Sequence, residues 1–93
     1  MSRRLSIHED AEAEIIEAAD YYDLASPGLG DEFVDEVRKA ISRAAEFPEA
    51  AHLIRGRVRS RGIARFPYSL VYSIQPSEIR IPAVAHQRMR PYY

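Results

Sequence analysis

The fold is decided by residues 25–33, ASPGLGDEF, which divide one long helix-forming region into two helices. Before this stretch, apolar residues recur at helical spacing and predict a first helix that starts at Asp10. Ser26 resembles a helix cap and Pro27 fits the first helical position, so a second helix is predicted from here to about Phe47. Helices joined by so short a connection should form an antiparallel hairpin. The apolar residues of the two helices are Ile15, Ala19, Tyr22, Leu29, Phe33, Val37, Ala40, Ile41 and Ala44.

Beyond the helices, the apolar spacing changes from a helical period to the alternation typical of strands. A loop is predicted around residues 49–56. Because Pro82 cannot donate a hydrogen bond within a sheet, we expect it at an edge or a bulge. Helices followed by strands predict an α+β fold in a single domain over residues 1–93, with an N-terminal strand and an antiparallel two-helix hairpin packed on an antiparallel β-sheet. The predicted strands are Arg4–Ile7, Val58–Phe66, Ser69–Gln75 and Glu78–His86.

The composition excludes several classes of protein. With 93 residues, 46% of them hydrophobic, the chain fits one small globular domain. It contains no cysteine, which excludes a disulfide framework and a thiol nucleophile, and no metal-ligand spacing or glycine-rich phosphate loop occurs. We therefore expect no metal and no cofactor. No stretch reaches the roughly 20 apolar residues that a membrane span needs, and we expect a cytoplasmic location.

Charge is distributed unequally along the chain, although the formal net charge is only -1. Residues 1–50 hold 5 Lys or Arg against 13 Asp or Glu, a net charge of -8. Residues 51–93 hold 8 Arg against one acid, Glu78, a net charge of +7. Such asymmetry indicates either a basic surface that binds a polyanion or an acidic partner, or two halves that attract each other.

The sharpest feature of the basic half is a set of arginines at strand spacing. In an unbroken strand these side chains would project from one face, opposite apolar residues such as Val58 and Phe66. The planar guanidinium makes bidentate contacts with carboxylates or phosphates. An ordinary solvated sheet face is the alternative, and a bulge at Gly62 would break the alignment. The set comprises Arg57, Arg59, Arg61 and Arg65.

A second candidate site lies at residues 86–93, HQRMRPYY. It combines an imidazole, two guanidiniums and two phenols, which could transfer protons, hold a phosphate and stack on bases during RNA cleavage. The alternative is a structural histidine followed by a tail. The acidic residues of both helices are interpreted as solvated faces.

Four stretches together resemble the RelE/ParE toxin superfamily, and in particular its ParE-like branch. They are AADYY at residues 18–22, SPGLGDEF at 26–33, RFPYSLVY at 65–72 and AVAHQR at 83–88. The motifs are short, but their order and spacing match over nearly the whole chain. The resemblance implies a helical hairpin against an antiparallel sheet, and a type II toxin that is neutralised by an antitoxin segment wrapped around it.

Members of this superfamily either poison DNA gyrase or cleave mRNA on the ribosome, and fold alone does not separate the two activities. The ParE-like stretches favour a non-enzymatic inhibitor of gyrase. Acidic residues on the second helix also favour it, because they would repel ribosomal RNA. The enzymatic alternative is a metal-independent endoribonuclease, and a third alternative is a non-toxic relative that only binds antitoxin. Candidate catalytic residues for the nuclease are Arg65, His86, Arg88 and Tyr92.

The expected partners are a cognate ParD-like antitoxin, in a hetero-oligomer, and either DNA gyrase or ribosome-bound mRNA as the target. The antitoxin is expected to present an amphipathic helix and an extended acidic or apolar tail. Its carboxylates are expected to pair with Arg57, Arg59, Arg61 and Arg65.

Overall fold

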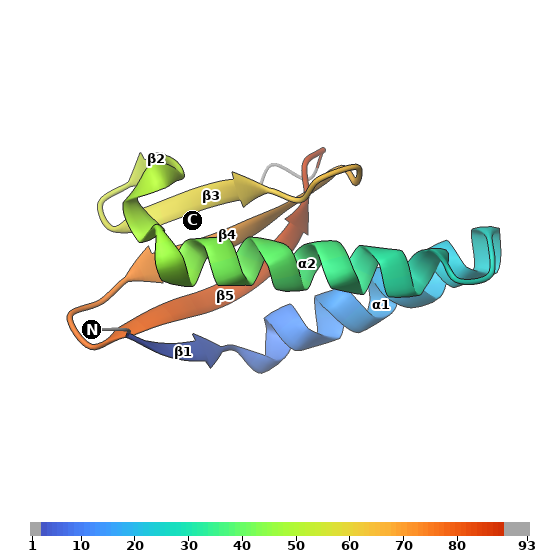
Figure 1. Cartoon of the computed structure of the whole chain (residues 1–93), viewed down its shortest axis with the longest axis horizontal. Coiled ribbons are helices and arrows are strands. Elements are labelled where there is room, and N and C mark those ends of the chain that lie inside the picture. Colours follow the sequence, from blue (N-terminus) through green and yellow to red (C-terminus); the bar gives the residue numbers. More distant parts are fainter. Residues whose placement is uncertain (1–2, 89–93) are drawn as a thin grey trace.

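Two helices lie side by side on one face of a β-sheet (Figure 1). The computed structural model describes residues 3–88. Strand β1 (Arg4–Ile7) leads into helix α1 (Glu9–Ala25), and helix α2 (Leu29–Glu46) returns beside α1. Both predicted helices and their hairpin arrangement are therefore confirmed. Neither helix, nor any other in the described part of the chain, is long and apolar enough to cross a membrane.

The connection between the helices depends on two glycines. Gly28, with a φ of +89°, is the N-cap of α2, which corrects the expectation that Ser26 caps the helix and Pro27 opens it. A left-handed φ suits glycine because it has no Cβ. A Cβ on Gly30 would collide with the Ala19 carbonyl oxygen, so the two helices approach each other by their backbones at this point.

Within the described residues the sheet has five strands in the order β1-β5-β4-β3-β2, and it is mixed. The pairs β3–β4 and β4–β5 are antiparallel, as predicted; β2 also pairs antiparallel with β3, whereas β1 runs parallel to β5. The α+β fold is confirmed, and β1 adds a parallel edge to the predicted antiparallel sheet. Most of the chain separates β1 from β5, so no turn signal in the sequence reports their relative direction. The four remaining strands are β2 (His52–Arg55), β3 (Val58–Gly62), β4 (Tyr68–Ile74) and β5 (Glu78–His86).

Two strand predictions need correction. Residues 49–56, predicted as a loop, contain the end of a 3-10 helix η1 (Pro48–Ala50) and all of β2. All four residues of β2 are exposed, so the strand lacks the alternation by which strands are recognised. Strand β3 ends at Gly62 and does not reach Phe66, because a turn from Ile63 to Phe66 follows it, closed by the Phe66 N–H donating to the Ile63 carbonyl at 3.3 Å.

The core lies between the helices and the sheet. An aromatic cluster occupies one end of it: the ring centroids of Tyr22 and Phe66 are 4.9 Å apart, and those of Phe33 and Phe66 are 5.1 Å apart. At the other end, the buried Tyr72 hydroxyl donates to the Pro48 carbonyl at 2.6 Å and ties β4 to η1. The largest fully buried side chains are Tyr72, Phe33, Leu70, Ile79, Ile81, Val37 and Val84.

Strand β5 is irregular around Pro82, as predicted. The register with β4 shifts between the pairs Val71↔Ala83 and Ser73↔Arg80, which places Pro82 within the bulged segment. Beyond the bulge, the Val84 N–H donates to the Glu14 carboxylate of α1 at 2.9 Å. Glu14 therefore completes the hydrogen bonding of the strand, which corrects its interpretation as part of a solvated face.

Candidate partner-binding surfaces

The basic half of the chain does not form a single arginine face. Arg59 lies opposite Tyr72 and Arg61 opposite Leu70 in the β3–β4 register. Residues directly opposite each other on antiparallel strands share a face, and Tyr72 and Leu70 are core residues. The two arginines therefore extend from the helix-covered face, which corrects the prediction that the basic face and the core face are separate.

Arg59 is held by the fold. Its Nη1 donates to the Glu49 carbonyl at 3.1 Å and to the Ala51 carbonyl at 2.9 Å. Both carbonyls belong to the segment that leads from η1 into β2, so the guanidinium fixes the edge strand relative to β3. Arg59 thus has a structural role, and its predicted part in antitoxin binding stays a prediction.

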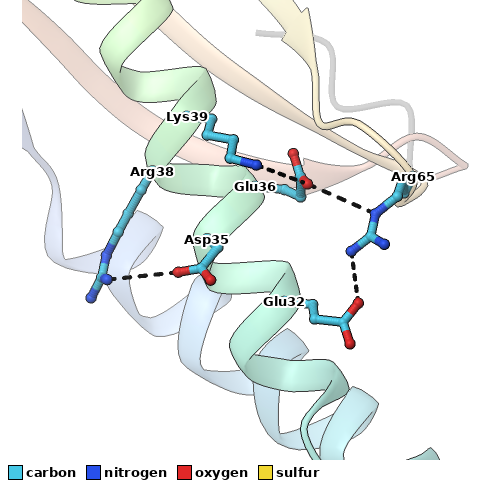
Figure 2. Close-up of polar contacts among 6 residues, drawn as sticks. All are labelled: Glu32, Asp35, Glu36, Arg38, Lys39 and Arg65. Carbon is cyan, nitrogen blue, oxygen red and sulfur yellow. Dashed lines mark hydrogen bonds and ion pairs between the residues drawn. The ribbon is translucent and has the colours of Figure 1, made fainter.

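Arg65 lies outside the strand and pairs with helix α2 (Figure 2). Its Nη2 is 2.8 Å from a carboxylate oxygen of Glu32, and its Nε is 3.8 Å from one of Glu36. The residue adopts a φ of +70°, a left-handed conformation that is unusual for a side-chain-bearing residue. The prediction that Arg65 continues the row of arginines is wrong because the turn after β3 redirects the chain. Glu36 is also not a solvated acid, since it pairs with Arg65 and, at 3.6 Å, with Lys39.

Arg57 and Arg61 remain available for partners. Arg57 is exposed, and the one hydrogen bond of its side chain within the described residues is long, 3.5 Å from Nη1 to Oε1 of Gln75. Arg61 lines a small open pocket beside Lys39 and Arg43 of α2. Its Nε is buried without a hydrogen-bond partner among residues 3–88, and a buried charged donor of this kind is normally satisfied. The Arg57 guanidinium can therefore donate to a partner's carboxylate without losing a strong internal contact, and Arg61 lies beside an open pocket that a carboxylate can enter.

An apolar groove runs between the two helices, next to strand β1. It is lined by isoleucines from three elements, with Glu12 and Arg38 at its border. Ile16 in this groove is 60% exposed. This groove was not predicted from the sequence. Alternation and helical spacing assign apolar residues to the core, and they do not distinguish core residues from apolar residues that line a surface groove. The apolar lining consists of Ile7, Ile15, Ile16, Val34, Val37 and Ile41.

The edge strand β2 offers a second surface. It pairs with β3 on one side and forms the end of the described sheet on the other. Leu53 and Ile54 are 48% and 45% exposed. An edge with exposed apolar side chains can pair with an added strand. From residue 50 to residue 77 the chain has five arginines and no acid, so the surroundings of this edge are positively charged.

Three of the four candidate nuclease residues can be placed, and Tyr92 lies outside the described residues. Arg65 is engaged with α2. The Arg88 backbone N–H donates to Nδ1 of His86 at 3.1 Å, which leaves the proton of a neutral imidazole on Nε2. The His86 ring packs edge-on against Tyr68 with centroids 5.0 Å apart.

His86 belongs to an open aromatic pocket, which also includes Pro67 and three tyrosines. Burial raises the pKa of the Tyr68 hydroxyl above its usual value, and the nearby Tyr21, Glu14 and Glu17 raise it further. The sequence predicts a site role for His86 but for none of these tyrosines, and it assigns Tyr22 to the apolar face of the first helix. We call this feature the aromatic pocket, and its lining residues are Tyr21, Tyr22, Pro67, Tyr68 and His86.

No group of three or more His, Asp or Glu side chains within residues 3–88 is arranged to hold a metal ion. The features that this part of the chain does offer are the groove, the edge, the two arginines and the aromatic pocket. Such features suit recognition of another macromolecule.

Residues 5–91 match the family model described as "ParE toxin of type II toxin-antitoxin system, parDE". Among solved structures, a chain of the "Chromosomal ParDE TA system from P. aeruginosa" superposes with a TM-score of 0.79, over 90% of this chain and 95% of that chain. The two sequences are 18% identical, so this likeness shows the shared fold. No curated protein sequence matches the chain.

Proposed function

Because the chain belongs to the ParE toxin family of parDE type II toxin-antitoxin systems, we propose that it arrests bacterial growth by acting on DNA gyrase and that a ParD-like antitoxin neutralises it. The parDE system implies a cognate antitoxin. The target and the mode of neutralisation are the proposed steps, and the surfaces of the molecule support them as follows.

The apolar groove is the observation that best supports neutralisation by a wrapped segment. An amphipathic helix binds by laying its apolar face into such a groove, with anchors at helical spacing. Ile16, exposed by 60%, offers apolar area that a bound helix would remove from water. Glu12 and Arg38 at the border can select the direction of the helix through its own charges.

The β2 edge supports a second contact, with the extended acidic tail of the antitoxin. An added strand would complete the backbone hydrogen bonds of β2 and cover Leu53 and Ile54. Arg57 and Arg61 would pair with carboxylates of the tail, whereas Arg59 and Arg65 keep their internal partners. The apolar contacts would carry most of the affinity, and the arginines would raise the association rate.

Two observations support DNA gyrase as the target: the chain belongs to the ParE family, and Arg65 is paired with carboxylates of α2. Under the nuclease alternative, Arg65 and Arg88 would contact the scissile phosphate. The Arg65 guanidinium is instead paired with Glu32 and Glu36 on the acidic helix α2 (Figure 2), and a phosphate would have to displace these carboxylates. This arrangement favours the non-enzymatic inhibitor.

The direct test is to express the chain alone and to follow growth, DNA and messages in the same culture. We expect growth arrest with DNA breaks covalently linked to gyrase, and relief of the arrest when the cognate antitoxin is co-expressed. Cleaved messages on ribosomes without gyrase-linked breaks would establish the nuclease. Normal growth with well-folded, antitoxin-binding protein would establish the non-toxic relative.

A further inference from the structure

Residues from three distant parts of the chain converge at the aromatic pocket. Tyr21 and Tyr22 come from α1, Pro67 and Tyr68 from the start of β4, and His86 from the end of β5. These residues lie in three of the four stretches that resemble the superfamily. Tyr21 is 66% exposed, and a large aromatic residue so exposed at the mouth of a pocket is suited to contacting a partner.

The charge around the pocket selects the class of ligand. Glu14 and Glu17 are close enough to raise the pKa of the Tyr68 hydroxyl, so their negative charge is felt inside the pocket. Two arginines lie two residues from the lining along the chain: Arg65 is paired with Glu32 and Glu36, and Arg88 sets one positive charge against the two carboxylates of Glu14 and Glu17. Aromatic faces carry negative electrostatic potential as well. The pocket therefore favours a cation and disfavours a phosphate.

The ring geometry points the same way. Tyr21 and Tyr22 stand at 72° with centroids 5.4 Å apart, and Tyr22 and Tyr68 at 71° with centroids 6.3 Å apart. The His86 ring stands at 74° to Tyr68. None of these neighbouring pairs is parallel, so the pairs cannot sandwich a flat nucleobase. Rings at such angles instead line different sides of the pocket. A cation inside the pocket is attracted to the face of each ring whose centre lies within about 6 Å.

We propose that the aromatic pocket binds a lysine or arginine side chain of the protein that this toxin inhibits. The proposal rests on the toxin function proposed above. Among residues 3–88, the pocket shares no lining residue with the apolar groove or with strand β2, so the antitoxin can occupy those surfaces independently. The cation would lie against the tyrosine rings, with Glu14 and Glu17 providing the counter charge.

The first test uses the purified chain and two small probes of nearly the same shape. N-acetyl-arginine amide carries the charge, and N-acetyl-citrulline amide lacks it. We expect the arginine probe to shift the NMR signals of the Tyr21, Tyr22 and Tyr68 rings and to bind about two- to fivefold more tightly than citrulline. Equal binding of the two probes, or tighter binding of adenosine monophosphate, would overturn the proposal.

Matched variants identify the groups responsible. Tyr21→Phe keeps the aromatic face and should retain most of the binding, whereas Tyr21→Leu should lose about two- to fivefold. Because Tyr21 is largely exposed, neither change should disturb folding. Glu17→Gln should lower the affinity for the arginine probe and leave the affinity for the citrulline probe unchanged. Glu9→Gln, at the far end of the same helix, should change neither affinity. Equal losses in Tyr21→Phe and Tyr21→Leu would contradict a role for the ring face.

A cellular comparison separates this proposal from the proposed function. We expect Tyr21→Leu to weaken growth arrest relative to Tyr21→Phe, with antitoxin affinity unchanged in both. Full arrest by Tyr21→Leu would exclude the pocket as the target site and leave the toxin function standing. Loss of antitoxin affinity in Tyr21→Leu would assign the pocket to the antitoxin and overturn the proposal. If the unchanged chain does not arrest growth, the toxin function itself fails, whatever the probes show.

Discussion

Arg59 and Arg61 are two residues apart on one strand, extend from the same face, and have different surroundings. Arg59 donates to two backbone carbonyls, whereas Arg61 lines an open pocket and its buried Nε has no partner in the part of the chain that the structure describes. The same contrast separates Arg65, which pairs with α2, from the exposed Arg57. The four arginines that form one row in the sequence therefore divide into two that hold the fold together, Arg59 and Arg65, and two that a partner can reach, Arg57 and Arg61. An arginine belongs to the first group when backbone carbonyls or carboxylates of the fold lie within reach of its guanidinium.

The largest expected effect is the loss of stability in Arg59→Ala. Hydrogen bonds from a charged donor contribute about 1.5–3 kcal/mol each, so removing the bonds to Glu49 and Ala51 should lower the free energy of unfolding by about 2–3 kcal/mol after solvent competition for the more exposed bond. Urea denaturation measures this change. Arg57→Ala is the matched control and should change the free energy of unfolding by less than about 0.5 kcal/mol. Similar losses in the two variants would remove the distinction between them.

For antitoxin binding, we expect the larger effect from the arginines that contribute little to stability, Arg57 and Arg61. The Arg57→Ala, Arg61→Ala double variant should associate with the antitoxin roughly tenfold more slowly at low salt, because charge complementarity acts mainly on the association rate. The difference should shrink as salt screens the charges. Stopped-flow or surface-based kinetics at two salt concentrations measures both effects. An unchanged association rate would show that these arginines do not meet the antitoxin's acids.

An intermediate effect is expected at Tyr72, whose ring lies beside both Arg59 and Arg61. Tyr72→Phe removes the hydrogen bond to the Pro48 carbonyl and should cost about 1 kcal/mol at neutral pH. Burial raises the pKa of the Tyr72 hydroxyl, more than the two arginines lower it. The folded state therefore favours the protonated phenol, and its contribution to stability is present below the unfolded pKa of about 10 and lost as the pH rises through the folded pKa. Denaturation at pH 8 and at pH 11 should show a smaller alkaline loss in Tyr72→Phe than in the parent chain.

The sequence contains the information for the helical hairpin and most of the sheet. Spacing places both helices, and Pro82 marks the bulge in β5 because proline lacks the N–H that a regular ladder requires. Strand β2 is missed because its side chains are all exposed, and the direction of β1 is missed because its partner β5 is distant in the chain. Local patterns report periodicity, and these two features depend on contacts between distant segments.

The candidate site is less predictable for a related reason. The two-residue spacing of Arg59 and Arg61 places them on one face, but whether an arginine of the row finds an internal acceptor depends on distant residues: the Glu49 carbonyl accepts from Arg59, and the Glu36 carboxylate pairs with Arg65. His86 is recognisable as a chemically useful residue. Its tyrosine neighbours on α1 belong to another part of the sequence, and nothing local predicts that they form one pocket with it.

The smallest expected effect is at Arg65, where an exposed ion pair competes with backbone strain. Its ion pair with Glu32 is solvent-exposed on both sides and should contribute less than about 1 kcal/mol. The φ of +70° penalises any residue with a Cβ, so Arg65→Gly should be more stable than Arg65→Ala by roughly 0.5–1 kcal/mol, even though glycine gives the unfolded chain more freedom. Glu32→Gln removes the ion pair without touching the turn, and its loss should be a few tenths of a kcal/mol. If Arg65→Ala were as stable as Arg65→Gly, the turn would not be strained, and Arg65 would owe its position to the carboxylates of α2 alone.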